Sequence, residues 1–355
     1  MQQVDYLIVG QGVSGSFLAW YLHQAKKSFL IIDNQKDNAA SRIASGVINP
    51  ITGRRFVRTW MIEEIMPFAV NAYHNIETAT DANFIEQKNI INFHTTPQMQ
   101  IAFEERLTAE QEYLSKVDDF IAYQNYFNFS FGIGEIKPCW WINMPIFIKA
   151  INKWLSNNSY LLQEDFEIKD VQILSDEIVY RNIKANKILF CDGVESTSNP
   201  WFKNLPFAIN KGEAIIFSSK TSLPTKNIFK QGLTITPWQN DLFWIGSTYE
   251  WNFDNTQPTE IFKQKVISTL NYWLKDEFVI ENHVASLRPA NVERRPFVGL
   301  HPTHPQIGIL NGMGAKGCSL APYFANEFVQ HLLFSKPINK LADVNRFSKI
   351  LQKII

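Results

Sequence analysis

Apolar residues mark the same order of elements near both ends of the chain. The run over 4–9 (VDYLIV) is typical of a buried parallel strand, and apolar residues then recur at helical spacing over 17–25. A second strand is predicted over 28–32. Near the other end, 307–310 predicts a short strand and 318–334 a helix. The pattern therefore predicts a strand, a loop and a helix twice, once at each end.

The middle of the chain predicts helices mixed with alternating strands. Helices are predicted over 60–76, 98–115 and 259–274, and strands over 84–93, 214–217, 233–237 and 243–246. Pro322 falls in the first turns of the last predicted helix, so that helix is expected to start late or to bend. A chain of 355 residues is long for one core, and we expect two lobes.

The first loop has the sequence Gly10-Gln-Gly12-Val-Ser-Gly15 between the predicted strand and helix. Gly10 permits a tight turn, Gly12 lets the backbone approach a pyrophosphate, and Gly15 lets the helix pack closely on the strand. Asp33 ends the second strand 18 residues after Gly15, where a carboxylate accepts hydrogen bonds from ribose hydroxyls. The segment therefore predicts a site for a dinucleotide without a 2′-phosphate.

A P-loop is the alternative interpretation of these glycines. That motif needs Lys and then Ser or Thr directly after its last glycine, and this chain has Ser16 and Phe17 there. The first loop thus lacks the cation that a bound triphosphate requires.

The second loop, 311–317 (NGMGAKG), lies between the last predicted strand and helix. Its three glycines let the backbone approach a flat ligand, and the helix N-terminus after it places positive charge at one edge of that ligand. A flavin has such an edge, because negative charge develops at its N1 and C2 carbonyl side on reduction. The alternative is a surface turn before a helix.

Composition restricts the partners and the compartment. Lys plus Arg and Asp plus Glu both number 34, which disfavours nucleic acid as a partner but leaves it open. Three widely spaced cysteines suit free thiols. His301 and His304 flank Pro302, and we expect no metal there or elsewhere. With no apolar run of membrane length, a cytoplasmic protein is expected and a membrane is not expected as a partner.

The chain resembles the D-amino acid oxidase or glycine oxidase family of flavoproteins. The resemblance is carried by both glycine loops, Asp33, 40–50 (ASRIASGVINP), 287–289 (LRP) and 320–322 (LAP). It implies an α/β fold, with a glutathione-reductase-type Rossmann domain for FAD and a mixed-sheet α+β substrate domain. It also implies that a carbon–nitrogen bond of a small amine or amino acid is oxidised by hydride transfer to the flavin. Oxygen or another acceptor would then take the electrons.

The resemblance also assigns domains and site residues. It implies an FAD-binding domain from 1–60, 140–205 and 280–355, and a substrate domain from 61–139 and 206–279. The implied cofactor-binding residues are Gly10, Gly12, Val13, Ser14, Gly15, Asp33, Asn34, Ser41, Arg42, Ala44, Ser45, Gly46, Ile168, Gly193, Gly312, Met313, Gly314, Ala315, Lys316 and Gly317. Arg288 and Tyr249 are the implied substrate-binding residues, and no catalytic base is assigned.

Some of these residues have a second interpretation. Arg288 suits a substrate carboxylate, but it could instead form a structural ion pair with Glu293. Tyr249 could be a core aromatic residue. Cys318 could form a covalent bond to the flavin or simply pack beside the loop. Met313 stands where many members of the family carry His, and Lys316 adds a cation near the flavin that could stabilise the reduced anion or bind substrate.

Three further alternatives concern function. Arg54, Arg55 and Arg58 form a local basic cluster, either a solvated turn or a surface that attracts an anionic substrate or a nucleic acid backbone. The segment 40–50 also resembles the oxidase domain of the bifunctional wobble-uridine tRNA modification protein. The third alternative is a flavin-binding subunit or sensor without catalysis. Oligomeric state and substrate identity are left open.

Overall fold

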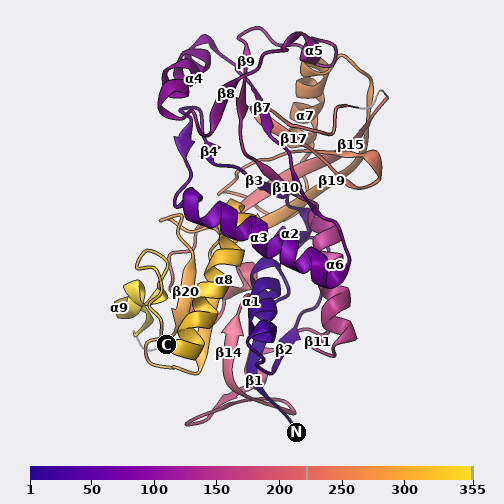
Figure 1. Cartoon of the computed structure of the whole chain (residues 1–355). Coiled ribbons are helices and arrows are strands. Elements are labelled where there is room, and N and C mark those ends of the chain that lie inside the picture. Colours follow the sequence, from indigo (N-terminus) through magenta and orange to yellow (C-terminus); the bar gives the residue numbers. More distant parts are fainter. Residues whose placement is uncertain (221–222, 353–355) are drawn as a thin grey trace.

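The computed structural model describes residues 1–220 and 223–352, which form two lobes around two eight-stranded sheets. Figure 1 shows the lobe with both termini below and the second lobe above, with α4 (Pro97–Ala109), α5 (Ile121–Gln124) and α7 (Glu260–Trp273). Between the two lobes in the same view lie α2 (Ala40–Ile43), α3 (Ile62–Thr80) and α6 (Met144–Asn157). The mixed sheets and helices confirm the predicted α/β class with a mixed second lobe.

The first sheet has a parallel centre made of strands that are buried on both faces. Its order is β11, β2, β1, β14, β13, β12, and β21 also pairs with β14 and β20. Strand β1 runs parallel to β2 and β14, which explains its nearly continuous apolar sequence. The strands are β1 (Gln2–Val9), β2 (Phe29–Ile32), β11 (Leu161–Leu162), β12 (Val171–Ile173), β13 (Ile178–Tyr180), β14 (Ile183–Phe190), β20 (Phe297–Leu300) and β21 (Ile307–Asn311).

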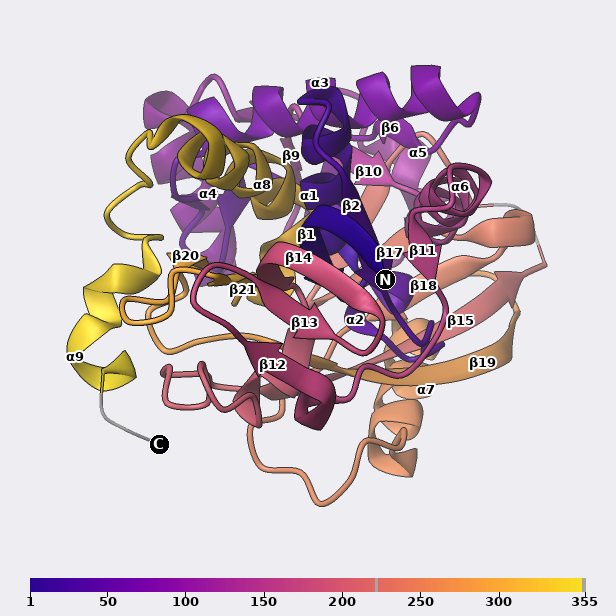
Figure 2. The ribbon, with the colours of Figure 1, turned by 90° about the horizontal axis from the view of Figure 1, so that it is seen from below.

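Helices α1 (Val13–Gln24) and α8 (Gly317–Phe334) follow the two glycine loops and pack together. Figure 2 shows both helices on one side of the parallel strands β1 and β14, while β13 and β12 extend from β14 away from these helices. A Cβ at Gly15 would overlap the carbonyl of Gly10, so only glycine lets α1 approach the first strand this closely. Both predicted strand, loop and helix units are therefore confirmed.

Helix α8 begins at Gly317 and continues through Pro322. The expectation that this helix starts late, after the proline, was therefore wrong. Pro322 has no N–H for the carbonyl of Cys318 four residues earlier. The buried hydroxyl of Tyr73 donates to that carbonyl instead, at 3.1 Å. Tyr73 belongs to α3 (Ile62–Thr80), so the hydrogen bond joins α3 to the start of α8.

The second sheet is mixed and has the order β19, β15, β18, β17, β16, β7, β9, β8. Most pairs are antiparallel, but β16 runs parallel to β7. The strands are β7 (Ile90–Phe93), β8 (Leu114–Lys116), β9 (Ile133–Ile136), β15 (Asn210–Ser219), β16 (Ile228–Gln231), β17 (Leu233–Pro237), β18 (Phe243–Gly246) and β19 (Phe278–Arg288). Residues 280–288, which fall in the predicted FAD-binding range, belong to this sheet; the division into the two domains stays a prediction.

The remaining elements connect the lobes or cover them. The helix expected over 98–115 ends at Ala109, and its last residues form β8 instead. The short strands are β3 (Val47–Ile48), β4 (Ile51–Thr52), β5 (Val57–Arg58), β6 (Ile85–Gln87) and β10 (Trp140–Ile142). The other helices are α2 (Ala40–Ile43), α4 (Pro97–Ala109), α5 (Ile121–Gln124), α6 (Met144–Asn157), α7 (Glu260–Trp273) and α9 (Ser348–Leu351). Across residues 1–220 and 223–352, no helix combines the length and the apolar character needed to cross a membrane.

Candidate functional site

A cavity of about 770 Å³ lies where the first sheet meets the second. Its walls include Val9, Ile32 and Phe190, at the carboxyl ends of three parallel strands, and Trp244 and Arg288 from the second sheet. This volume is within the roughly 300–1,000 Å³ typical of ligand sites. The position matches the rule that open α/β sheets bind ligands beyond the carboxyl ends of their strands.

The cavity brings together most of the predicted site residues from both ends of the sequence. Those that line it are Gly10, Gly12, Val13, Ser14, Asp33, Asn34, Ser41, Ala44, Ser45, Ile168, Gly193, Tyr249, Arg288, Met313, Gly314, Ala315 and Gly317. Two glycine loops more than 290 residues apart therefore face the same space.

Five predicted cofactor-binding residues do not line the cavity. Gly15 packs against the carbonyl of Gly10, and Gly46 packs against the backbone of Ile142. Gly312 accepts a hydrogen bond from Asn291 Nδ2 at 2.9 Å. Arg42 is half-buried, and its Nη2 has no hydrogen-bond partner among the described residues.

Lys316 is the fifth, and it binds Thr59, which does not line the cavity either. Its Nζ donates to Thr59 Oγ1 at 3.1 Å. Burial, and to a smaller extent the nearby charges of Arg295 and Arg294, lower the pKa of Lys316 to about 8. The amine is therefore a partly buried cation that binds a hydroxyl instead of a carboxylate.

Side chains from neighbouring segments hold the first glycine loop in place. Asp33 accepts hydrogen bonds from the backbone N–H of Gln11 at 2.7 Å and of Gln35 at 2.6 Å. Ser41 Oγ accepts from the backbone N–H of Val13 at 3.0 Å. A Cβ at Gly12 would contact Ser41 Oγ at 3.1 Å, so the loop leaves no spare room for a side chain there.

Asp192 is a cavity residue that was not among the predicted site residues. It follows β14 and accepts hydrogen bonds from the hydroxyl of Ser196 and from Asn311 Nδ2, the latter at 3.3 Å. Burial raises its pKa to about 6. The sequence Cys191-Asp192-Gly193 follows β14 directly, and only Gly193 of these three was among the predicted residues.

Arg288 is held entirely by neutral groups. Its Nη1 donates to Asn210 Oδ1 and to the backbone carbonyl of Thr248, both at 2.9 Å, and its Nη2 donates to Ser247 Oγ at 2.7 Å. The ring of Tyr249 lies over the guanidinium, with 4.6 Å from Cζ to the ring centroid. Burial lowers the pKa of Arg288, but a guanidinium stays protonated in proteins.

The alternative ion pair of Arg288 is not formed. Glu293 pairs with Arg346 instead, at 3.0 Å between Oε2 and Nε. Within the described part of the chain, no Asp or Glu oxygen comes within 4.0 Å of the Arg288 guanidinium. Tyr249 is 53% exposed while it lines the cavity, so it is not a core residue. The cavity therefore contains a positive charge that the protein itself leaves uncompensated.

Of the remaining candidates, Cys318 lines the cavity, whereas the basic cluster of Arg54, Arg55 and Arg58 does not. Burial raises the pKa of the Cys318 thiol to about 12, and its Sγ lies 3.5 Å from Met144 Sδ. Arg58 pairs with Glu63 and Glu110, while Arg54 and Arg55 are exposed and do not line the cavity. The structure, over 1–220 and 223–352, contains no group of three or more His, Cys, Asp or Glu residues that could hold a metal ion.

Comparisons with known proteins agree with this geometry. A family model described as FAD dependent oxidoreductase matches residues 5–331. A glycerol 3-phosphate oxidase of Mycoplasma genitalium is 21% identical over 96% of this chain and 97% of its own length. The structure of glycine oxidase from Geobacillus kaustophilus is similar over 100% of both chains, with a TM-score of 0.81 and 16% identity. That of L-alpha-glycerophosphate oxidase from Mycoplasma pneumoniae, with FAD bound, has a TM-score of 0.76 and 16% identity over 96% of this chain and 98% of that one.

Proposed function

Because the chain belongs to the FAD dependent oxidoreductase family, we propose that it oxidises the carbon–nitrogen bond of a small amine or amino acid with Arg288 binding the substrate's carboxylate. The observation that carries this proposal is the uncompensated guanidinium of Arg288 in the wall of the cavity. A planar guanidinium binds a carboxylate through two parallel hydrogen bonds, which fixes orientation as well as position.

The cavity fits FAD, the cofactor of this family. Gly10 and Gly12 would lie against the pyrophosphate, Asp33 would accept from the ribose, and the second glycine loop would lie along the flavin ring. When bound, FAD supplies the two-electron acceptor for the oxidation. Tyr249, Arg288 and Met313 line the cavity together, and we assign to them the part where the substrate binds.

The chain's own residues would act mainly by orientation. Arg288 would hold the carboxylate so that the substrate's reacting carbon faces the cofactor, which removes rotational freedom before the reaction. Both carboxylate oxygens of Glu213 accept hydrogen bonds from Thr259, from its N–H at 2.7 Å and from its hydroxyl at 3.0 Å. Glu213 is therefore not available as a base. The substrate amine would react in its neutral form, and the imine product would be hydrolysed by water.

A second candidate function differs in the substrate. A guanidinium binds a phosphate as well as a carboxylate, and a protein similar along the whole chain is a glycerol 3-phosphate oxidase. The same site would then oxidise a carbon–oxygen bond of a phosphorylated alcohol. The wobble-uridine oxidase alternative differs again, because it requires tRNA binding whose affinity falls steeply with salt.

The test is anaerobic bleaching of the FAD-loaded protein with a panel of amino acids, N-methyl amines and glycerol 3-phosphate. We expect an amino acid or an amine to bleach the flavin of the wild type. The bleaching rate should be at least about 100-fold lower in Arg288→Ala, because a misplaced substrate reacts poorly. Arg106→Ala, on α4, is the matched control and should react like the wild type. Unchanged bleaching in Arg288→Ala would reject the carboxylate role, and bleaching by glycerol 3-phosphate alone would select the second candidate. Reoxidation by oxygen or by a dye then identifies the electron acceptor.

A further inference from the structure

Two opposite charges are buried next to each other on β15, close to Arg288. Lys211 is 2% exposed and Glu213 is not exposed at all, and Lys211 Nζ lies 3.3 Å from Glu213 Oε1. Gly212, between them, faces the other way, because a Cβ there would overlap the Arg288 guanidinium. Lys211 and Glu213 therefore lie on the face of the sheet opposite the Arg288 side chain.

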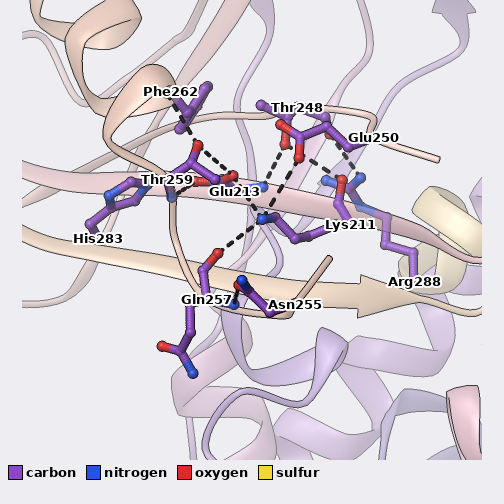
Figure 3. Close-up of polar contacts among 10 residues, drawn as sticks. All are labelled: Lys211, Glu213, Thr248, Glu250, Asn255, Gln257, Thr259, Phe262, His283 and Arg288. Atoms are coloured by element: carbon purple, nitrogen blue, oxygen red, sulfur yellow. Dashed lines mark hydrogen bonds and ion pairs between the residues drawn. The ribbon is translucent and has the colours of Figure 1, made fainter. Parts of the chain in front are cut away.

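Both charged residues bind the segment 248–259, which we call the tethered loop (Figure 3). The backbone of Lys211 pairs with that of Glu250 through two hydrogen bonds of 2.8 and 3.0 Å. Lys211 Nζ also donates to the carbonyl of Gln257 at 2.9 Å. Glu213 binds the end of the loop through Thr259, and the backbone N–H of Glu213 donates to Thr248 Oγ1 at 2.9 Å. Lys211 and Glu213 thus form hydrogen bonds near both ends of the loop.

The tethered loop carries two of the groups that hold Arg288. The Thr248 carbonyl accepts from Arg288 Nη1, and the Tyr249 ring covers the guanidinium. Tyr249 in turn stacks on Trp251, with ring centroids 6.4 Å apart, and Thr256 lines the cavity. A shift of the loop would therefore move one hydrogen-bond partner and the aromatic cover of Arg288 together.

A buried ion pair is a costly way to stabilise a fold. Replacing both charges by apolar residues of similar volume is often neutral for stability, and in some proteins the buried charges serve to specify one arrangement. Here each charge takes hydrogen bonds from the tethered loop, Lys211 with the Gln257 carbonyl and Glu213 with Thr259. Glu250 and His283 add one ionic contact each, at 3.7 Å to Lys211 and 2.9 Å to Glu213. This makes the pair a constraint on the position of the loop more than a source of stability.

We propose that Lys211 and Glu213 are positioning residues that hold the tethered loop so that Thr248 and Tyr249 fix Arg288 for the substrate's anionic group. The inference rests on the proposed function, since it assumes that Arg288 binds that group. His283 belongs to the same network, because its Nε2 lies 2.9 Å from Glu213 Oε2 on the side away from Lys211 (Figure 3).

The test measures binding of acetate, as the anionic probe, to the FAD-loaded protein. Binding is detected by the change in the flavin absorption spectrum. The main variant is Lys211→Met/Glu213→Leu, which removes both charges together and leaves neither one buried alone. We expect its FAD content and melting temperature to stay near wild type while the acetate Kd rises about 10-fold or more, because Arg288 is no longer fixed. Thr259→Val removes one hydrogen-bond donor to Glu213 and should raise the acetate Kd by a smaller factor. If the double variant does not load FAD, the acetate Kd of Thr259→Val tests the positioning role in its place.

Glu277→Gln is the matched control, because it breaks the exposed pair between Lys220 and Glu277 at the far end of the same strand pair. A Tyr249→Leu change should weaken acetate binding in the wild type but add little in the double variant, since both act through the same ring. An unchanged acetate Kd in the double variant, with binding lost in Arg288→Ala, would overturn the positioning role and leave the proposed function intact. Acetate binding retained in Arg288→Ala would reject the proposed function itself. If Glu277→Gln weakened acetate binding as much as the double variant does, the effect would be a general one of the sheet, and the inference would be overturned.

Discussion

The contact between Gly212 and Arg288 gives a prediction whose size can be worked out from the structure. A Cβ at Gly212 would stand closer than 3.0 Å to Cζ and to both Nη atoms of Arg288. The φ of Gly212 lies outside the left-handed region, so Gly212→Ala strains no backbone angle and acts only through this overlap. The guanidinium has to retreat, and it cannot do so and keep its bonds of 2.7 Å to Ser247 and 2.9 Å to Asn210.

The cost appears in two measurements. Overpacking of this kind destabilises a protein by about 1–3 kcal/mol, which denaturant unfolding of the FAD-loaded protein would detect. Loss of a hydrogen bond between a charged group and its ligand costs about 1.5–3 kcal/mol, which corresponds to a rise of roughly 10- to 150-fold in the acetate Kd. An acetate Kd within a factor of two of wild type, in a folded variant, would refute the assignment of Arg288 as the anion-binding group in this geometry.

Three further predictions concern the rest of the site. Asp33→Asn should weaken FAD binding about 10- to 100-fold, because it removes the carboxylate that accepts from Gln11, and fluorescence titration of the apoprotein measures this. Burial lowers the pKa of His301 from 6.5 to about 4. The contribution of its neutral imidazole to the free energy of unfolding is therefore complete above pH 6.5 and is lost as the pH falls to about 4. Urea unfolding should show a loss of up to about 3 kcal/mol over that range that is absent in His301→Gln, which keeps an acceptor for Thr303. Lys316→Met should raise the melting temperature at pH 7, since it removes a partly buried cation with a lowered pKa; a lower melting temperature would contradict this.

The elements of the fold that the sequence predicted best are those specified by neighbouring residues. The first strand, glycine loop and helix lie within 24 residues, and the periodicity of each is set by burial against a single sheet. The strands over 233–237 and 243–246 were predicted at their observed bounds for the same reason. The helix predicted over 98–115 was too long, because its last residues pair with β9, a strand about twenty residues further along the chain.

The site itself depends on contacts that sequence spacing does not contain. Arg288 was selected from the motif around it, but its partners Asn210 and Ser247 lie on other segments, 78 and 41 residues away. Lys211 and Glu213 precede the strand predicted over 214–217 and were not among the predicted site residues; in the structure both are buried and bind a later loop. Long-range pairing of this kind is fixed by the tertiary fold and not by local propensity.

The hydrogen bond from Tyr73 to the carbonyl of Cys318 also bears on how this sequence can vary through evolution. The two residues are 245 positions apart, and the carbonyl needs an external donor only because Pro322 has none to offer. A lineage that replaced Pro322 by a residue with an N–H would satisfy the carbonyl within the helix and leave the buried Tyr73 hydroxyl competing for it. Tyr73→Phe beside a retained proline would instead leave the carbonyl unpaired. Substitutions at positions 73 and 322 should therefore be inherited together, even though neither side chain carries any of the chemistry.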